Sequence, residues 1–224
     1  MKKIIIAAGL VILLAAVVFT AVILRDRNSP SGEASTAAGI ETESKTLYTQ
    51  KPATDINVDS WLKISAITSY NGKLAVVAEN ISDTDVEYAL LTVKNGNEEY
   101  TFNASALLRS TKVMLTCNED VNFSPDAQYT LWKTENIVYF TAPPSLHEDK
   151  FETSISQGSI SVKNISGKDI DSDIFIYYKL IQDGFPDGSI THRVKLSGLD
   201  ARAKTFVNSS SISEGNCKIM FIQY

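Results

Sequence analysis

Three aspartates alternate along one stretch of this 224-residue chain: Asp169, Asp171 and Asp173. Carboxylates in such an arrangement can offer oxygen ligands to calcium. The EF-hand pattern then fails, because Ile174 stands where glycine is required and Leu180 stands where the bidentate glutamate belongs. Alternation beside a turn is also typical of a solvated strand face. We expect that solvated face here and keep a calcium site as the lesser alternative.

Two cysteines, Cys117 and Cys217, are the other residues that could do chemistry. A disulfide between them would join the two halves of the chain, and a reactive thiolate would indicate an enzyme or redox protein. A thiolate nucleophile needs a positioned base or cation, yet both histidines, His147 and His192, follow Cys117 and neither has metal-ligand spacing. We favour two small buried thiols, with no catalytic residue and no cofactor.

The chain contains an internal repeat that must position these residues. The triplet Asn-Ile-Ser at residues 80–82 returns at 164–166, and the flanking residues match as well. Apolar residues precede each triplet at equivalent places, and an aspartate followed by a β-branched residue comes after each one, at Asp85 and at Asp169. Self-similarity over such a period predicts two copies of one structural unit. The cysteines fall at non-equivalent places in the two copies.

Short β-branched and aromatic runs, separated by turn signals, continue from Ile56 to the end of the chain. Hairpin signals are the pairs Asn71-Gly72, Asn95-Gly96, Asp183-Gly184 and Asp187-Gly188. The pattern predicts strands near residues 61–68, 73–80, 89–94, 98–103, 111–117, 127–133 and 136–141, and in the second copy near 151–156, 159–164, 172–181, 189–197, 203–208 and 217–223.

Six or seven short strands per copy, with no helical periodicity in this part of the chain, predict an all-β fold of two tandem immunoglobulin-like antiparallel β-sandwiches. The expected domains are residues 55–142 and 143–224. Pro143 and Pro144 mark the boundary, because proline interrupts strand pairing and stiffens a join.

The N-terminal residues predict a membrane anchor. Residues 4–24 carry no charge and would span about 30 Å as a helix, which matches the hydrocarbon core of a bilayer. A cleaved secretory signal is the alternative, but its apolar run is shorter and ends in a small-x-small site. We therefore expect an uncleaved transmembrane signal anchor at 1–27. Residues 28–54, rich in Ser, Thr, Ala, Gly and Glu, predict a flexible, disordered tether.

Charge sets the expected location and excludes one class of partner. Signal anchors at an N-terminus usually leave the short end in the cytoplasm, so we expect a single-pass cell-membrane protein with extracytoplasmic C-terminal domains. The chain has 26 acidic and 21 basic residues, and four of the basic ones lie in residues 1–27. An acidic surface repels phosphate backbones, so nucleic acid is an unfavourable partner.

The second copy resembles a known family of bacterial extracytoplasmic domains. Residues 162–166 read Val-Lys-Asn-Ile-Ser, residues 175–179 read Phe-Ile-Tyr-Tyr-Lys, and Leu199 and Phe206 follow. This is similar to the FxLYD family of immunoglobulin-like domains, in which an Asn-x-Ser turn precedes a Phe-x-Leu-Tyr-Asp strand. Tyr177 and Lys179 depart from that pattern, and the first copy matches it less closely. The resemblance implies a surface or envelope module and carries over no catalytic residue.

These observations predict a non-catalytic binding or assembly module of the bacterial envelope. Its partners would be the membrane, through the anchor, and a protein or cell-envelope polymer recognised by loops or a sheet edge. Two alternatives stay open. One is an envelope enzyme or redox protein that uses Cys117 or Cys217, and the other is a passive spacer or accessory subunit of a membrane complex.

Overall fold

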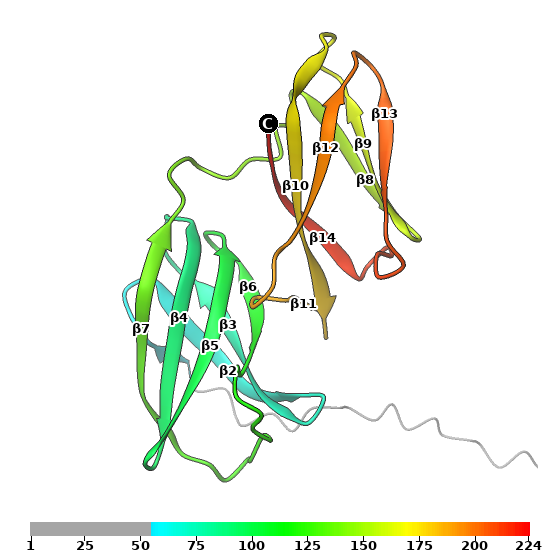
Figure 1. The fold of residues 1–224 in the computed structure, drawn as a ribbon. Helices are drawn as coiled ribbons and strands as arrows, with labels where there is room; N and C mark the ends of the chain where they lie inside the picture. The colour runs from blue at the N-terminus through cyan, green and yellow to red at the C-terminus, as the bar shows by residue number, and fades with distance from the viewer. Residues whose placement is uncertain (1–54) are drawn as a thin grey trace, which may run out of the picture. The chain divides into compact units, whose positions relative to one another are not determined.

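The computed structural model describes residues 55–224, which lie within one compact unit (Figure 1). The expected anchor at 1–27 and tether at 28–54 lie outside the described residues. Among residues 55–224, no helix is long and apolar enough to cross a membrane. The strands are β1 (Ile56–Asn57), β2 (Leu62–Tyr70), β3 (Lys73–Asn80), β4 (Val86–Asn95), β5 (Glu98–Leu107), β6 (Lys112–Thr116), β7 (Tyr129–Tyr139), β8 (Phe151–Ser156), β9 (Ser159–Asn164), β10 (Ile170–Gln182), β11 (Phe185–Pro186), β12 (His192–Leu199), β13 (Lys204–Asn208) and β14 (Cys217–Gln223).

The strands form four antiparallel sheets, consistent with two sandwich-like domains, and the all-β prediction is confirmed. In the first sandwich the sheet β1-β2-β3-β6 faces the sheet β5-β4-β7 (Figure 1). In the second, β8-β9-β13 faces the sheet in which β10 pairs with both β12 and β14. The order β2-β3-β6 and β5-β4-β7 thus recurs as β8-β9-β13 and β12-β10-β14. The repeat in the sequence is also a repeat of strand order.

The glycine pairs at two hairpins adopt the conformation that their sequence predicts. Asn71 and Gly72 have positive φ angles of 50° and 82° and connect β2 to β3. Asp183 and Gly184, at 51° and 83°, connect β10 to β11 in the same way. Two consecutive positive φ angles are the requirement of a type I′ turn, which matches the twist of the flanking strands.

Two local predictions were wrong. Residues 127–133 and 136–141 were expected as separate strands, whereas β7 is one strand that keeps its pairing with β4 through several register shifts. Asp187-Gly188 was expected as a hairpin turn, but Gly188 pairs with strands of the first sandwich, and β12 begins only at His192. A contact between distant parts of the chain overrides the local turn signal there.

Each sandwich encloses its own apolar core. Leu91 and Val93 of β4 point into the first core, and Ile174 and Ile176 of β10 point into the second. A third, smaller cluster joins residues of both sandwiches: Ala106, Met220 and Phe221, with Leu108, Phe140 and Tyr177 packed against them. The apolar surface of the described chain is therefore buried partly between the two sandwiches.

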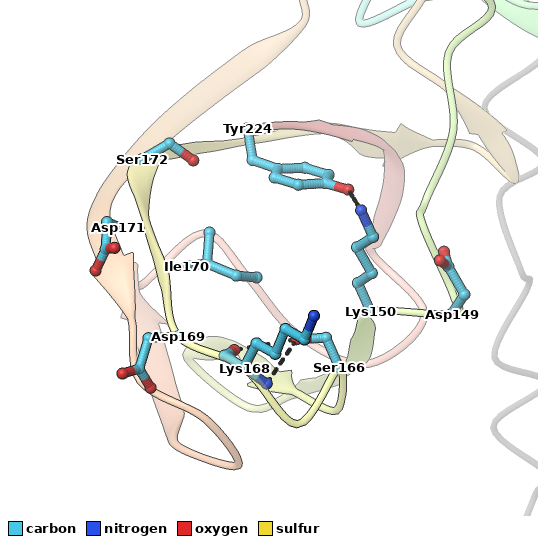
Figure 2. A pocket seen from close by; sticks show the side chains of 9 residues that line it. All are labelled: Asp149, Lys150, Ser166, Lys168, Asp169, Ile170, Asp171, Ser172 and Tyr224. Atoms are coloured by element: carbon cyan, nitrogen blue, oxygen red, sulfur yellow. Dashed lines mark hydrogen bonds between the residues drawn. The ribbon is translucent and has the colours of Figure 1, made fainter.

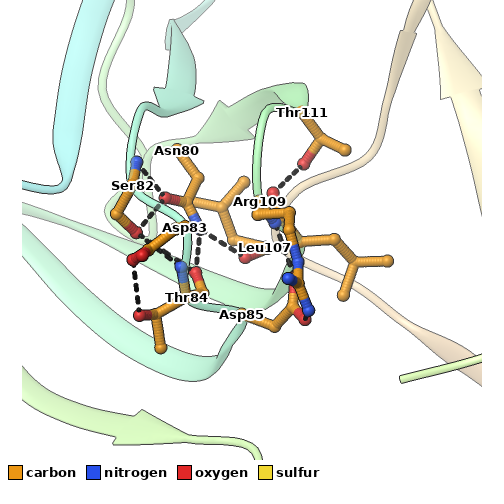
Figure 3. A network of polar contacts seen from close by, with 9 residues as sticks. Asn80, Ser82, Asp83, Thr84, Asp85, Leu107, Arg109 and Thr111 are labelled. Atoms are coloured by element: carbon orange, nitrogen blue, oxygen red, sulfur yellow. Dashed lines mark hydrogen bonds and ion pairs between the residues drawn. The ribbon is translucent and has the colours of Figure 1, made fainter. Parts of the chain in front are cut away.

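Asn80, the asparagine of the first triplet, holds a buried polar turn of the first sandwich, and we call this turn with its hydrogen bonds the corner (Figure 3). The Asn80 side chain is fully buried, and its amide nitrogen donates to the carbonyl oxygens of Thr84 (2.8 Å) and Leu107 (3.0 Å). Its amide oxygen accepts from the backbone nitrogen (3.0 Å) and hydroxyl (2.8 Å) of Ser82. The turn after β3 is thereby tied to the end of β5, in the facing sheet.

The second sandwich has a corner with the same four hydrogen bonds. Asn164, also fully buried, donates to the carbonyl oxygens of Lys168 (2.7 Å) and Leu199 (2.9 Å). Its amide oxygen accepts from the nitrogen (3.0 Å) and hydroxyl (2.8 Å) of Ser166. Each triplet thus begins a turn, and the serine that both corners share explains why Asn-x-Ser recurs as a unit.

Substitution of Asn80 by alanine should destabilise the protein by about 2–4 kcal/mol, because buried carbonyls and the Ser82 groups lose their partners. Urea unfolding followed by the fluorescence of Trp61, which lies in the same core, measures this change. Asn97→Ala, at an exposed turn of the same sandwich, is the control and should change stability by less than about 0.5 kcal/mol. Equal stabilities of the two variants would contradict this role for Asn80.

Candidate functional site

The three aspartates of the calcium alternative take separate roles. Asp169 accepts a hydrogen bond from the backbone nitrogen of Ala201 (2.7 Å), so it belongs to the corner around Asn164. Asp173 forms an ion pair with Lys195 (2.7 Å) on the outer face of β10 and β12. Asp171 lies between them, at a register irregularity of β10. Across residues 55–224, no group of three or more His, Cys, Asp or Glu side chains is placed to hold a metal ion.

Both cysteines are free, buried thiols in different cores. Burial, together with a hydrogen bond from the sulfur to Glu119 (3.0 Å), raises the pKa of Cys117 to about 12. Burial raises the pKa of Cys217 to about 11. Thiols with such pKa values remain protonated at neutral pH and are poor nucleophiles. Both sulfurs are free in the structure.

A surface hollow of about 570 Å³ opens at one end of the second sandwich (Figure 2). Lys150 reaches across it to the hydroxyl of Tyr224, and its ammonium also lies 4.7 Å from the centre of that ring. Asp149, Lys168 and Asp171 line other parts of the wall. The hollow is open and carries both signs of charge, and Lys150 is bonded to Tyr224 within the fold. It offers a polar surface without an arrangement of nucleophile and base.

Lys179 is the most unusual polar residue of the described chain. It lies in β10, between the inward-facing Tyr178 and Leu180, and its side chain is 0% exposed. Its ammonium donates to the carbonyl oxygens of Asp187 (2.6 Å) and Ile190 (3.2 Å). Burial lowers its pKa to about 8, and the charge of Asp187 partly opposes that shift. A buried ammonium is tolerated only when its donors are satisfied, as they are here by backbone oxygens.

The backbone that Lys179 holds is residues 187–191, which we call the clamp segment. The buried carboxylate of Asp187 accepts from the backbone nitrogens of Ser189 (2.8 Å) and Ile190 (3.2 Å). Its other oxygen accepts from the side chain of Gln182 (2.8 Å). These bonds, with those of Lys179 on the outer face of β10, fix the shape of the clamp segment.

The clamp segment closes an open side of the first sandwich. The backbone nitrogen of Gly188 donates to the carbonyl of Met114 (2.6 Å) in β6, and its carbonyl accepts from the nitrogen of Ser105 (2.8 Å) in β5. Ser189 accepts from the nitrogen of Thr116 (3.2 Å) through its hydroxyl. β5 and β6 are edge strands of the two facing sheets. One segment, which bends at Gly188 and Ser189, therefore satisfies backbone groups of both edges.

Glycine is required at position 188 because of the closeness of this contact. A Cβ atom there would lie 2.4 Å from Cδ2 of Leu115 and 2.5 Å from Cγ2 of Val113. Both side chains are fully buried in β6 and have little room to move. Any other residue would push the clamp segment away from the edge.

Sequence reasoning did not identify Lys179 or Gly188 as important. Lys179 was placed in a strand, and its only signal was that a lysine occupies a position where the FxLYD pattern has aspartate. Gly188 was assigned to a hairpin, because an Asp-Gly dipeptide in the sequence does not distinguish a hairpin turn from a contact with another sheet. The partner of each residue lies on a different segment of the chain, and the sequence gives no sign of that pairing.

Comparisons with protein-family models, with curated proteins and with solved structures gave no match for this chain.

Replacing Gly188 by alanine should loosen the clamp segment. The added methyl group must displace Leu115 or the clamp backbone, so stability should fall by about 1–3 kcal/mol. Amide exchange at Ser105 and Thr116 should be faster by about tenfold, because their acceptors lie on the clamp segment. In Gly188→Ala/Val113→Ala the second change removes one of the two closest contacts, that with Cγ2 of Val113, so the combined cost should be less than the sum of the single costs. Unchanged exchange at both amides would exclude this contact.

Lys179 should give the protein a distinctive pH dependence. Its folded pKa of about 8 lies below the ordinary value of 10.5, so between these values the unfolded chain binds a proton that the folded chain has released. The unfolding free energy should therefore rise from pH 8 towards pH 10.5, by up to about 3 kcal/mol. Lys179→Met should lack this rise. Denaturant unfolding of both proteins from pH 7 to 10, followed by circular dichroism, tests this; parallel pH curves would count against it.

Proposed function

We propose that this chain is a membrane-anchored, extracytoplasmic binding or assembly module of the bacterial envelope and has no catalytic role. Its outer part would be a tandem of immunoglobulin-like sandwiches related to the FxLYD domains. The apolar run at residues 4–24 supports the anchor, and the equal strand order of the two sandwiches supports the tandem.

One observation carries the binding role. The clamp segment lies across the edges of β5 and β6 and recognises them through backbone hydrogen bonds. The edges of this sandwich thus exchange backbone hydrogen bonds with a segment from outside the sandwich, and an exposed sheet edge is one surface by which β-domains bind peptides. The buried thiols, with their raised pKa values, favour this interpretation over the enzyme or redox alternative.

The proposal is tested by crosslinking the tagged full-length chain in its source cells with an amine reagent that does not cross membranes. Exposed lysines such as Lys204 should react in intact cells, and a discrete adduct with an envelope component should be recovered. A cytosolic protein followed in the same cells is the control and should stay unlabelled. Reaction only after the cells are opened would refute the location, and recovery of labelled chain without any adduct would refute the binding role.

A further inference from the structure

The clamped edge of the first sandwich has an equivalent in the second. Met114 pairs with Val77, three residues before the repeated Asn80, and Phe206 pairs with Ser161, three residues before Asn164. Phe206 of β13 therefore corresponds to Met114 of β6. By the same strand order, β12 corresponds to β5. We call β12 (192–199) and β13 (204–208) together the open edge.

The open edge differs from the clamped edge in what covers it. Met114 is 1% exposed beneath the clamp segment, whereas Phe206 is 54% exposed. Within residues 55–224, β12 pairs only with β10, and β13 pairs only with β9. An exposed aromatic ring beside two unpaired strand edges is a surface that another extended chain can cover.

Charge indicates the chemistry of the segment that would cover it. The ammonium of Lys204 lies 5.2 Å from the ring centre of Phe206, and Arg193 of β12 lies over the ring of Phe175 at 5.3 Å. Arg202, in the turn before β13, is exposed as well. Lys204 and Arg202 beside the exposed ring of Phe206 favour an acidic partner, because they can pair with carboxylates while the ring supplies apolar contact.

The side chains at the open edge also leave room for an extended segment. The residues that crowd Gly188 on the first sandwich are Val113 and Leu115, and the same strand pairing places Thr205 and Val207 at their equivalents. Valine is smaller than leucine, and threonine has nearly the shape of valine. A covering backbone can therefore approach as closely as the clamp segment does, with less restriction to glycine.

We propose that the open edge binds an acidic, extended segment of a partner protein, in the way that the first sandwich binds the clamp segment. This inference rests on the proposed binding function and specifies its partner class. A second copy of the chain does not supply the segment, because its clamp segment is already held by Lys179 and by its own first sandwich. The partner's backbone would pair with β13 and its carboxylates would meet Lys204 and Arg202.

The test uses the purified full-length chain in detergent and a fluorescein-labelled peptide with the sequence of residues 182–192, which includes two aspartates. Fluorescence anisotropy should show saturable binding with a Kd of about 100 µM, as expected for a small, exposed contact. Phe206→Asp should weaken binding at least tenfold, and Lys204→Glu should weaken it and reduce its salt dependence. A peptide with both aspartates changed to asparagine should bind more weakly.

Val138→Asp, an exposed residue on β7 of the first sandwich, is the matched control and should bind the peptide normally. Circular dichroism of each variant verifies folding, which an exposed position such as 206 should preserve. No binding up to 1 mM, or binding that Phe206→Asp leaves unchanged, would overturn the proposal. Sedimentation that shows dimers lost in Phe206→Asp would also overturn it, by making a second copy the occupant. Any of these results would leave the crosslinked adduct of the proposed function untouched, so the two failures can be told apart.

Discussion

The buried asparagine side chain is the constraint on which both sandwiches depend. An amide that is removed from water must find partners for its donors and its acceptor, and the penalty for leaving them unpaired is about 1–3 kcal/mol per group. Asn80 and Asn164 satisfy this requirement with the same four bonds, which link the turn after one strand to the end of a strand in the facing sheet. The relation between the two sheets, and hence the shape of each core, follows from that link.

Open strand edges are the second constraint. A sandwich of two small sheets exposes unpaired backbone groups along its sides, and such edges attract other strands. In the first sandwich, the edge at β5 and β6 is covered by the clamp segment, and the desolvation of Lys179 is the cost of holding that segment in shape. The two sandwiches are thereby joined by a polar contact next to the apolar cluster of Ala106 and Phe221.

These two constraints connect the fold to the proposed function. The same strand order that gives both sandwiches their corner also gives both an equivalent edge, but only one clamp segment exists in the described chain. The open edge of the second sandwich has an exposed phenylalanine, Phe206, with the basic side chain of Lys204 beside it. A module built from repeats can thus use one copy of a binding surface for its own assembly and keep the other for a partner.

The sequence by itself determined the features that depend on neighbouring residues. Short β-branched and aromatic runs and Asn-Gly or Asp-Gly pairs located most strands. The repeat of Asn-Ile-Ser marked the two corners, because the serine that satisfies each asparagine lies two residues away. The calcium alternative arose from the same local reading, which could not show that Asp169 is bound to a backbone group on another loop. The roles of Lys179, Gly188 and Phe206 were decided only by the tertiary structure. The partners of Lys179 and Gly188, and the exposure of Phe206, depend on which strand edges meet when the two sandwiches pack. That arrangement involves residues far apart in the chain.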